Sequence, residues 1–399
     1  MGYFSHMETL PHDSIFELMW AFKRDPRPKK IDLSVGIYYN QQLGLDILKS
    51  VKKAEEAFVE LEVEKAYLPI DGNSSFIEGT KKLLFGEVLT TRLGGAIYGA
   101  QTVGGTASLR VGGEFLAKAV SSVIHLSDPT WANHPAIFAR AGLKTAIYPY
   151  YSMQTNRLVF DDMMQYLKTL PPKSVVLLHG CCHNPTGCDP TQQQWKEISS
   201  LMLKKQLIPF FDVAYQGFGD GLEEDAFAVR YFAEQGHEML ISFSYSKIFG
   251  LYAERVGALF LVAASEKEAV IGSTHIRALI RANYSNPPKH GAVIVSYVLN
   301  DEKLKALWLS ELEKMRRRII DMRSLLYDIL SEKTKRKDYT YLSDAKGMFC
   351  FTGLEKSQVE RLIDEYGIYM LKTGRINVTG LNEDNIHYVG DAIIKVSEG

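Results

Sequence analysis

The sequence predicts an α/β protein with a mostly parallel sheet and flanking helices. In the middle of the chain, short apolar runs typical of buried strands alternate with longer periodic stretches typical of helices. Strands are expected at 123–126, 174–179, 207–211, 240–243 and 256–262, and helices at 107–119 and 192–204. The first helix follows a Gly-Gly-Thr turn and the second follows an Asp-Pro-Thr turn, so both have the usual signals of a helix start.

The last third of the chain predicts a second α+β region. A long, charged and periodic helix is expected at 302–330, followed by a polar stretch at 331–337. Residues 1–13 are expected to form an N-terminal arm. No internal repeat, low-complexity tract or long linker separates the parts, so we expect them to pack together.

Composition excludes several classes of function. The 399 residues carry 46 Lys plus Arg and 47 Asp plus Glu, a net charge of -1 that favours neither nucleic acid nor an anionic membrane. No apolar run is long enough for a membrane helix, and the N-terminus lacks a signal-peptide core. Three of the four cysteines fall within eight residues without metal-ligand spacing, so we expect no metal and reduced thiols in a cytoplasmic protein.

The segment after the strand at 240–243 carries the strongest chemical signal. Lys247 stands beside the hydroxyls of Ser244 and Ser246 and eight residues before Arg255. A lysine in this setting suits a Schiff base next to a bound phosphate, which Ser244 and Arg255 would hold. Taken alone, the same residues are equally compatible with a solvated lysine and a surface arginine.

Two further strand ends carry polar groups that suit a bound pyridine ring. Asp212 directly follows the strand at 207–211, where its carboxylate would keep a ring nitrogen protonated, and Tyr215 lies three residues on. Asn184 precedes a proline in a turn and would donate a hydrogen bond to a ring oxygen. Asp212 is by itself equally compatible with a helix cap, and the pairing with Lys247 favours the ring.

Further candidate contacts exist for a bound phosphate and for a bound aromatic ring. Gly104, Gly105 and Thr106 open the helix at 107–119, where free amides and the helix dipole favour an anion. Trp131 offers a surface for stacking on a flat ring, and His134 is placed to contact Asp212. Alone, the glycines would be an ordinary turn and the tryptophan a core residue.

Two arginines suggest a substrate with carboxylates. Arg375 and Arg281 each carry the planar fork that binds a carboxylate through two hydrogen bonds. Each is, singly, as compatible with an ordinary salt bridge.

In this order, the segments resemble class I aminotransferases of pyridoxal-phosphate fold type I, specifically the aspartate and aromatic-amino-acid branch. The likeness runs essentially end to end, from DPRPKKIDLSVGIYY at 25–39 through KGMF at 346–349 to GRINV at 374–378. It departs from the family at Ile248, where asparagine is common, and at Gly104, where many relatives have serine.

The resemblance implies a role for each candidate residue. Lys247 would form the Schiff base with pyridoxal 5′-phosphate, Asp212 would partner the pyridine nitrogen, and Tyr215 with Asn184 the ring oxygen. Trp131 would stack on the ring. The phosphate would be contacted by Gly104, Gly105, Thr106, Ser244, Ser246 and Arg255, and by Tyr67 from a second subunit. The substrate would be contacted by Gly36, Trp131, Asn184 and Arg375, and by Arg281 from the second subunit.

The resemblance also implies the architecture and the reaction. A large domain at 46–314 would hold a mainly parallel seven-stranded sheet, and a small domain would combine 14–45 with 315–399. The active sites would lie between the subunits of a homodimer. The implied enzyme moves the amino group of L-aspartate or an aromatic L-amino acid (Tyr, Phe) to 2-oxoglutarate by a ping-pong mechanism, giving L-glutamate and a 2-oxo acid.

Three other classes of function are less compatible with the sequence. A β-lyase or a decarboxylase would use the same cofactor and fold, but Arg375 with Arg281 favours transamination of a dicarboxylate. A nicotinamide dehydrogenase is disfavoured because the sequence has no G-x-G-x-x-G after a strand. A non-catalytic scaffold would have no use for the clustered polar groups. The sequence leaves open whether aspartate or an aromatic amino acid is the preferred donor.

Overall fold

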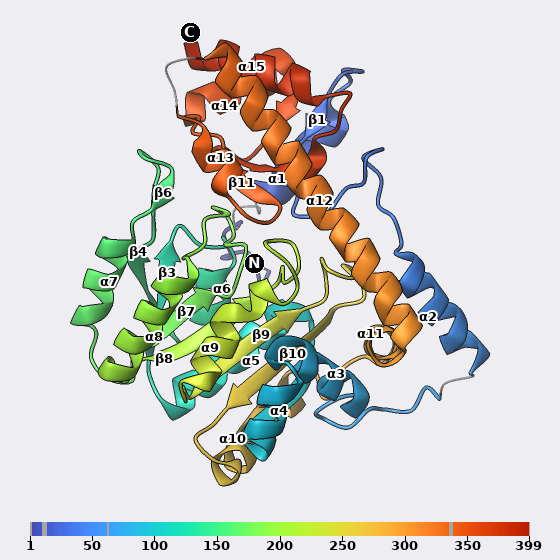
Figure 1. Cartoon of the computed structure of the whole chain (residues 1–399), viewed down its shortest axis with the longest axis vertical. Coiled ribbons are helices and arrows are strands. Elements are labelled where there is room, and N and C mark those ends of the chain that lie inside the picture. The colour runs from blue at the N-terminus through green and yellow to red at the C-terminus, as the bar shows by residue number, and fades with distance from the viewer. Residues whose placement is uncertain (1, 10–13, 62–63, 335–337, 399) are drawn as a thin grey trace.

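The computed structural model describes residues 2–9, 14–61, 64–334 and 338–398. Its centre is a seven-stranded sheet with the strand order β2-β10-β9-β8-β7-β3-β4 (Figure 1). β10 is antiparallel to both of its neighbours, and the other neighbouring strands pair in parallel. This confirms the predicted fold class. The strands are β2 (Ile97–Val103), β3 (Val123–Asp128), β4 (Lys144–Pro149), β7 (Val175–His179), β8 (Ile208–Val213), β9 (Met239–Ser244) and β10 (Val256–Val262).

Helices cover both faces of this sheet. α5 (Gly104–Ala119) packs on β2, β9 and β10, and α6 (His134–Arg140) and α10 (Glu266–Asn283) pack against α5. The opposite face carries α8 (Gln192–Lys205) and α9 (Phe227–Glu234). Consecutive strand residues point to opposite faces. Phe210 therefore meets Phe138 of α6, with ring centres 6.0 Å apart, whereas Phe211 meets Trp195 of α8 and Phe232 of α9. Burial on both faces explains the continuous apolar runs.

A second region joins the two ends of the chain. β1 (Ile31–Asp32) pairs in parallel with β12 (Ile368–Tyr369), and β11 (Phe349–Phe351) pairs antiparallel with β13 (Arg375–Asn377). The long helix α12 (Glu302–Lys333) reaches from the neighbourhood of α2 and α11 into this region, at the top of Figure 1. The other helices there are α1 (Ser14–Arg24), α13 (Thr340–Asp344), α14 (Lys356–Tyr366) and α15 (Ile386–Glu398), with η3 (Val378–Gly380).

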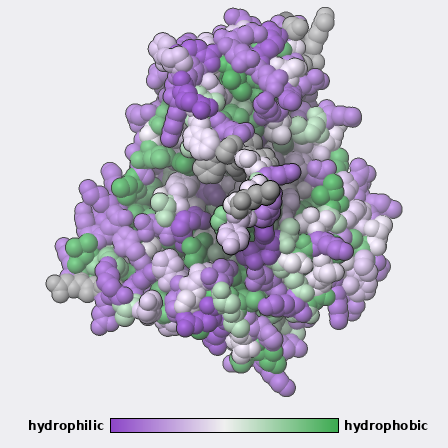
Figure 2. Space-filling view, turned by 180° about the vertical axis from the view of Figure 1, so that it is seen from behind, coloured by the Kyte–Doolittle hydropathy of each residue, from purple (hydrophilic) through white to green (hydrophobic). Residues whose placement is uncertain are grey.

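Shorter elements complete the chain. They are α2 (Lys49–Glu60), α3 (Ser74–Phe85), α4 (Glu87–Leu93), η1 (Gly94–Ala96), β5 (Tyr151–Ser152), β6 (Arg157–Leu158), α7 (Phe160–Thr169), η2 (Glu224–Ala226) and α11 (His290–Asn300). The face in Figure 2 is mainly hydrophilic, with apolar residues in small scattered groups. Among the described residues, no helix is long and apolar enough to cross a membrane.

Several element boundaries differ from the prediction. α5 begins at Gly104 rather than at 107, because Gly105 and Thr106 belong to its first turn. α8 begins where expected, since the Thr191 hydroxyl accepts from the Gln194 amide and the Gln194 side chain accepts from the Thr191 amide. α12 continues to Lys333, so residues 331–333 are helical instead of the start of a loop; 335–337 lie outside the described residues. Of the expected arm, residues 2–9 are described outside any helix or strand and are largely exposed, whereas Met1 and residues 10–13 lie outside the described residues.

Candidate active site

A cavity of about 210 Å³ lies at the edge of the sheet where the parallel strands end. Asp212 near the end of β8 is in register with His179 of β7 and Ser242 of β9, so the polar groups that follow these strands meet there. The lining residues are Gly36, Gly105, Thr106, Leu109, Trp131, Asn184, Asp212, Ala214, Tyr215, Ser244, Ser246, Lys247, Tyr252 and Arg255. A larger cavity, about 690 Å³, opens near Ile208 and Met239 at the starts of β8 and β9 and contains none of the predicted site residues.

Lys247 presents its amine to the cavity with a lowered pKa. Nζ lies 4.9 Å from the centre of the Tyr215 ring. Burial lowers the pKa of Lys247 to about 8; the negative charge of Asp212 opposes this shift and the positive charge of Arg255 adds to it. A substantial fraction of this amine is therefore neutral, and nucleophilic, near physiological pH.

Asp212 is a charged carboxylate in the same buried wall. Its Oδ2 lies 3.2 Å from His134 Nε2, so the contact predicted between these residues is present. Burial raises the pKa of Asp212, but the His134 hydrogen bond and the nearby charges outweigh it and leave the pKa below its usual value. The network continues through Thr130, whose Oγ1 is 2.8 Å from His134 Nδ1 and 3.3 Å from His179 Nε2. Burial lowers the pKa of His179 to about 3, so this imidazole is neutral.

Asn184 and Tyr215 form a second polar wall. Asn184 Nδ2 is 3.5 Å from the Tyr215 hydroxyl, and its Oδ1 is buried without a hydrogen-bond partner. Burial and the charge of Asp212 raise the pKa of Tyr215, which keeps the phenol protonated. A buried polar atom without a partner costs free energy unless a ligand satisfies it, so this wall fits a polar ligand in the cavity.

The start of α5 and the loop after β9 build a corner suited to an anion. Arg255 Nη1 bonds to the Tyr252 carbonyl at 3.0 Å and lies 3.5 Å from Ser246 Oγ. Ser244 Oγ in turn accepts from the Ser246 amide at 3.3 Å. These hydroxyls and the guanidinium meet the amino end of α5, where free N–H groups and the helix dipole attract negative charge.

Gly104 keeps this corner open, although it does not itself line the cavity. Its φ of +72° lies in the left-handed region, and an added Cβ would lie 2.5 Å from Arg255 Nη2. A serine here would therefore require a different arginine position or backbone conformation. The glycine at this position is thus compatible with the close approach of Arg255.

Arg375 is buried beside the cavity but is not among its lining residues. One Nη donates to the Ser34 carbonyl, the guanidinium lies 4.3 Å from the centre of the Phe349 ring, and Nε has no partner. Burial lowers the pKa of Arg375 to about 10, so the group is still charged at neutral pH. Asn377 donates to the carbonyls of Val35 and Ile37, each at 2.7 Å, and so holds Gly36 between them at the cavity wall.

Besides Gly104 and Arg375, two more predicted residues do not line this cavity. Tyr67 is 93% exposed, and Arg281 is exposed on α10, where it donates to the Ser285 hydroxyl. Neither lines the cavity of its own chain.

Several residues of the site could not be singled out from the sequence. Leu109 and Ala214 are apolar and gave no signal, whereas Tyr252 lies within the segment already singled out around Lys247. His179 was expected only as the end of a strand. The pairing of β7 with β8 places His179 beside Asp212. Knowledge of this register would have identified His179, because paired polar residues at one sheet edge lie close together.

The chain matches known proteins over nearly its whole length. Residues 28–393 match the family described as "Aminotransferase class I and II". The chain is 43% identical to an aspartate aminotransferase of Pseudomonas aeruginosa, over 99% of this chain and 100% of that protein. It is also 43% identical to an aromatic-amino-acid aminotransferase of Escherichia coli, over 98% and 100%. An aromatic-amino-acid aminotransferase of Burkholderia pseudomallei, solved covalently bound to pyridoxal phosphate, superposes with a TM-score of 0.97 at 42% identity, covering 99% of this chain and 100% of that one.

The balance of charges around Lys247 predicts opposite effects of two substitutions. Asp212→Asn removes a charge that raises the pKa of Lys247 and should lower it, whereas Arg255→Gln removes a charge that lowers this pKa and should raise it. The pKa of Lys247 can be measured as the pH midpoint of its labelling by fluorodinitrobenzene, which attacks an amine only in its neutral form. The ligand-free protein is labelled across a pH series. Mass spectrometry then follows the Lys247 peptide, with exposed Lys204 as internal control. Midpoints that move together, or not at all, would contradict this electrostatic description.

Proposed function

The chain belongs to the class I and II aminotransferase family, and we propose that it transfers the amino group of L-aspartate, tyrosine or phenylalanine to 2-oxoglutarate. It is a pyridoxal-phosphate-dependent transaminase. The observation that carries the proposal is the low-pKa amine of Lys247 in one cavity with the charged carboxylate of Asp212. We propose a ping-pong order, in which the enzyme carries the amino group from the first acid to the second, with L-glutamate and a 2-oxo acid as the products.

The residues present fit pyridoxal 5′-phosphate. Lys247 would hold the cofactor covalently and Asp212 would bond the ring nitrogen, while Asn184 and Tyr215 would bond the ring oxygen and Trp131 would stack on the ring. The phosphate would occupy the anion corner, contacted by Gly104, Gly105, Thr106, Ser244, Ser246 and Arg255. When bound to an amine, the cofactor withdraws electrons from the α-carbon, which allows its proton to leave.

Lys247 is proposed to act as the base as well as the anchor. Once a substrate amine has replaced it, Nζ would take the proton from the substrate's α-carbon and would deliver it to the cofactor's C4′. Its pKa of about 8 suits this role, because the amine can both accept and release a proton near neutral pH. Asp212 keeps its negative charge throughout, since the His134 bond holds its pKa low.

Two arginines are proposed to select the substrate. Arg375, charged and with an unpartnered Nε, would bind the α-carboxylate together with the backbone at Gly36. Arg281 is exposed and does not line the cavity of its own chain, so we propose that it enters the cavity of a second copy, where it binds the distal carboxylate. Tyr67 would reach the second copy's phosphate in the same way. Such shared sites require a homodimer.

We also infer how the chain is divided and where it works. The pairing of β1 with β12 supports a small domain formed by 14–45 and 315–399, with 46–314 as the large domain and 1–13 as an arm. The four free cysteines fit a reducing compartment, which supports the cytoplasm.

Replacement of Lys247 tests the proposed chemistry directly. Lys247→Ala should lower kcat by several powers of ten, because a general base alone contributes ~10²–10⁴ and the covalent anchor is lost as well. The exposed lysine in the last turn of α8 provides a control, since Lys204→Ala should leave the rate with aspartate or tyrosine unchanged. Near-normal turnover of the Lys247 variant would refute the assignment.

Mixing two inactive variants tests whether the site is shared between subunits. A Lys247→Ala subunit paired with an Arg281→Ala subunit should form one site with both residues intact. In a 1:1 mixture, about a quarter of the sites should therefore regain activity, because about half of the dimers are mixed. Activity with aspartate is measured after denaturing and refolding the two variants together. If Arg281 served its own subunit, the mixture would be no more active than its components.

The proposed role of Arg281 also predicts a change in donor preference. Arg281→Leu should lower kcat/KM for aspartate on the order of 10², the cost of a lost charge pair, and for tyrosine or phenylalanine by less than roughly tenfold. Single-turnover half-reactions with each donor measure this without the acceptor. Arg317→Leu, which removes an exposed arginine on α12, is the matched control. Equal losses for all three donors would remove Arg281 from distal-carboxylate recognition.

A further inference from the structure

The turn between β7 and α8 carries Asn184 and is held by one carboxylate. Asp189 Oδ2 accepts from the Cys182 amide at 2.6 Å, and Oδ1 accepts from the His183 amide at 2.8 Å. Cys182 has a φ of +51°, a left-handed conformation that is uncommon for a residue with a side chain. Both oxygens of Asp189 thus fix the two residues that immediately precede Asn184.

The imidazole of His183 is held just as firmly. Its Nε2 lies 2.9 Å from Ser127 Oγ and its Nδ1 2.9 Å from Thr186 Oγ1, and the ring stacks on Tyr150 with centres 4.1 Å apart. The backbone amide of Asn184 itself donates to His179 Nδ1 at 3.3 Å. The backbone that carries the Asn184 side chain is therefore held by hydrogen bonds at three consecutive residues, 182–184.

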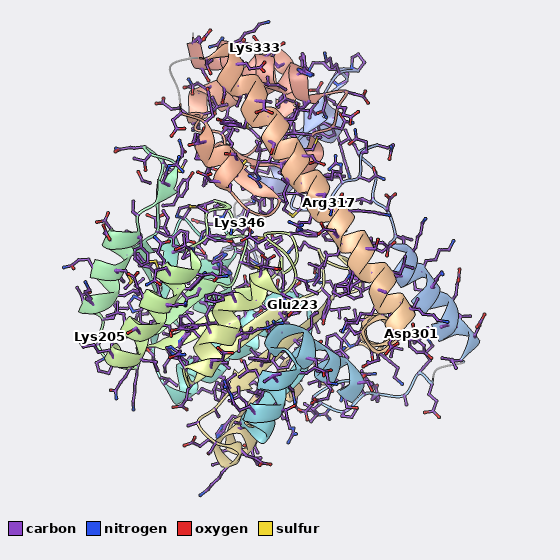
Figure 3. All side chains as sticks on the ribbon, in the orientation of Figure 1. Lys205, Glu223, Asp301, Arg317, Lys333 and Lys346 are labelled. Atoms are coloured by element: carbon purple, nitrogen blue, oxygen red, sulfur yellow. The ribbon has the colours of Figure 1, made fainter. Side chains whose placement is uncertain are left out.

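Lys346 ties this turn to the C-terminal region. Its backbone amide donates to the Gly187 carbonyl at 2.6 Å, and its ammonium pairs with Asp220. In Figure 3, Lys346 lies between the C-terminal region at the top and the seven-stranded sheet. Burial raises the pKa of Asp189 to about 6, while the His183 and Cys182 amides and the charge of Lys346 oppose the rise. Asp189 is therefore mainly ionised at neutral pH, and a charged acceptor binds backbone amides more strongly than a neutral one.

We propose that Asp189 is a positioning residue for transamination: its carboxylate holds the Cys182–His183 backbone so that the Asn184 amide points into the cavity. The inference rests on the proposed function, in which Asn184 donates a hydrogen bond to the cofactor's ring oxygen. Asp189 touches neither the substrate nor the cofactor, and its effect passes through Asn184.

Loss of this positioning has a spectroscopic signature. A donor to the ring oxygen stabilises its negative charge and so lowers the proton affinity of the bound chromophore. When that donor is misplaced, the pH midpoint of the cofactor's visible absorbance should rise. One lost hydrogen bond corresponds to roughly half to one pH unit.

The experiment is a double-mutant cycle on the cofactor-loaded enzyme. Absorbance is titrated against pH in the wild type, Asp189→Asn, Asn184→Ala and the double variant. Both single substitutions should raise the midpoint, and Asp189→Asn should add little once Asn184 is absent. Glu311→Gln is the matched control, because Glu311 also accepts from two consecutive amides, those of Lys49 and Ser50, away from the cavity. Its midpoint should equal that of the wild type.

Each other outcome has a distinct meaning. An unchanged midpoint in Asn184→Ala would refute the proposed role of Asn184 and, with it, that part of the proposed function. A shift in Asn184→Ala without one in Asp189→Asn, full additivity in the double variant, or an equal shift in Glu311→Gln would overturn the inference alone. If Asp189→Asn does not fold, Asp189→Ser is titrated instead. The serine hydroxyl can accept from only one of the two amides. A midpoint that rises, but by less than in Asn184→Ala, supports the proposal, and a wild-type midpoint overturns it.

Discussion

The site depends on one electrostatic pairing, that of a desolvated amine with a desolvated carboxylate. Burial by itself would make Lys247 a weak base and Asp212 a neutral acid. The negative charge of Asp212 keeps the pKa of Lys247 near 8 rather than lower, and the imidazole of His134 keeps Asp212 ionised. The ionised form of Asp212 therefore raises the pKa of Lys247, and the positive charge of Lys247 favours the ionised form of Asp212. Removing either one would change the chemistry of both, because neither is exposed enough for water to take the partner's place.

The topology of the sheet is what brings these groups together. Asp212, His179 and Ser244 are far apart in sequence, yet the parallel pairing of β7, β8 and β9 places their strand ends at one edge. The antiparallel β10 starts at that edge, directly after Arg255, and β2 ends there before α5 begins. The anion corner is thus the meeting point of a helix start and an antiparallel strand start. A wholly parallel arrangement would leave Arg255 at the opposite end of the sheet.

Sequence reasoning found the central strands and most of the cavity because the relevant signals are local. The apolar runs that became β7 to β10 are buried on both faces, and the residues around Lys247 form one continuous segment. The misses have a different physical origin. His179 needs strand register, and the first turn of α5 depends on the left-handed φ of Gly104. Arg281 and Tyr67 are not misses, because the family resemblance assigns both to a second subunit; their exposed positions are compatible with that proposal, which no pattern within one chain could supply. The hydrogen bonds of Asp189 to the turn that carries Asn184 could not be predicted, because an aspartate directly before a proline is also a common signal for the start of a helix.

The most direct test of the account is the identity of the residue that binds the cofactor. The loaded enzyme is reduced with borohydride, digested, and its peptides are weighed by mass spectrometry. The account predicts that the reduced cofactor is attached to the peptide containing Lys247 and to that peptide alone. Attachment to a different lysine, or release of all the cofactor unreduced, would contradict it.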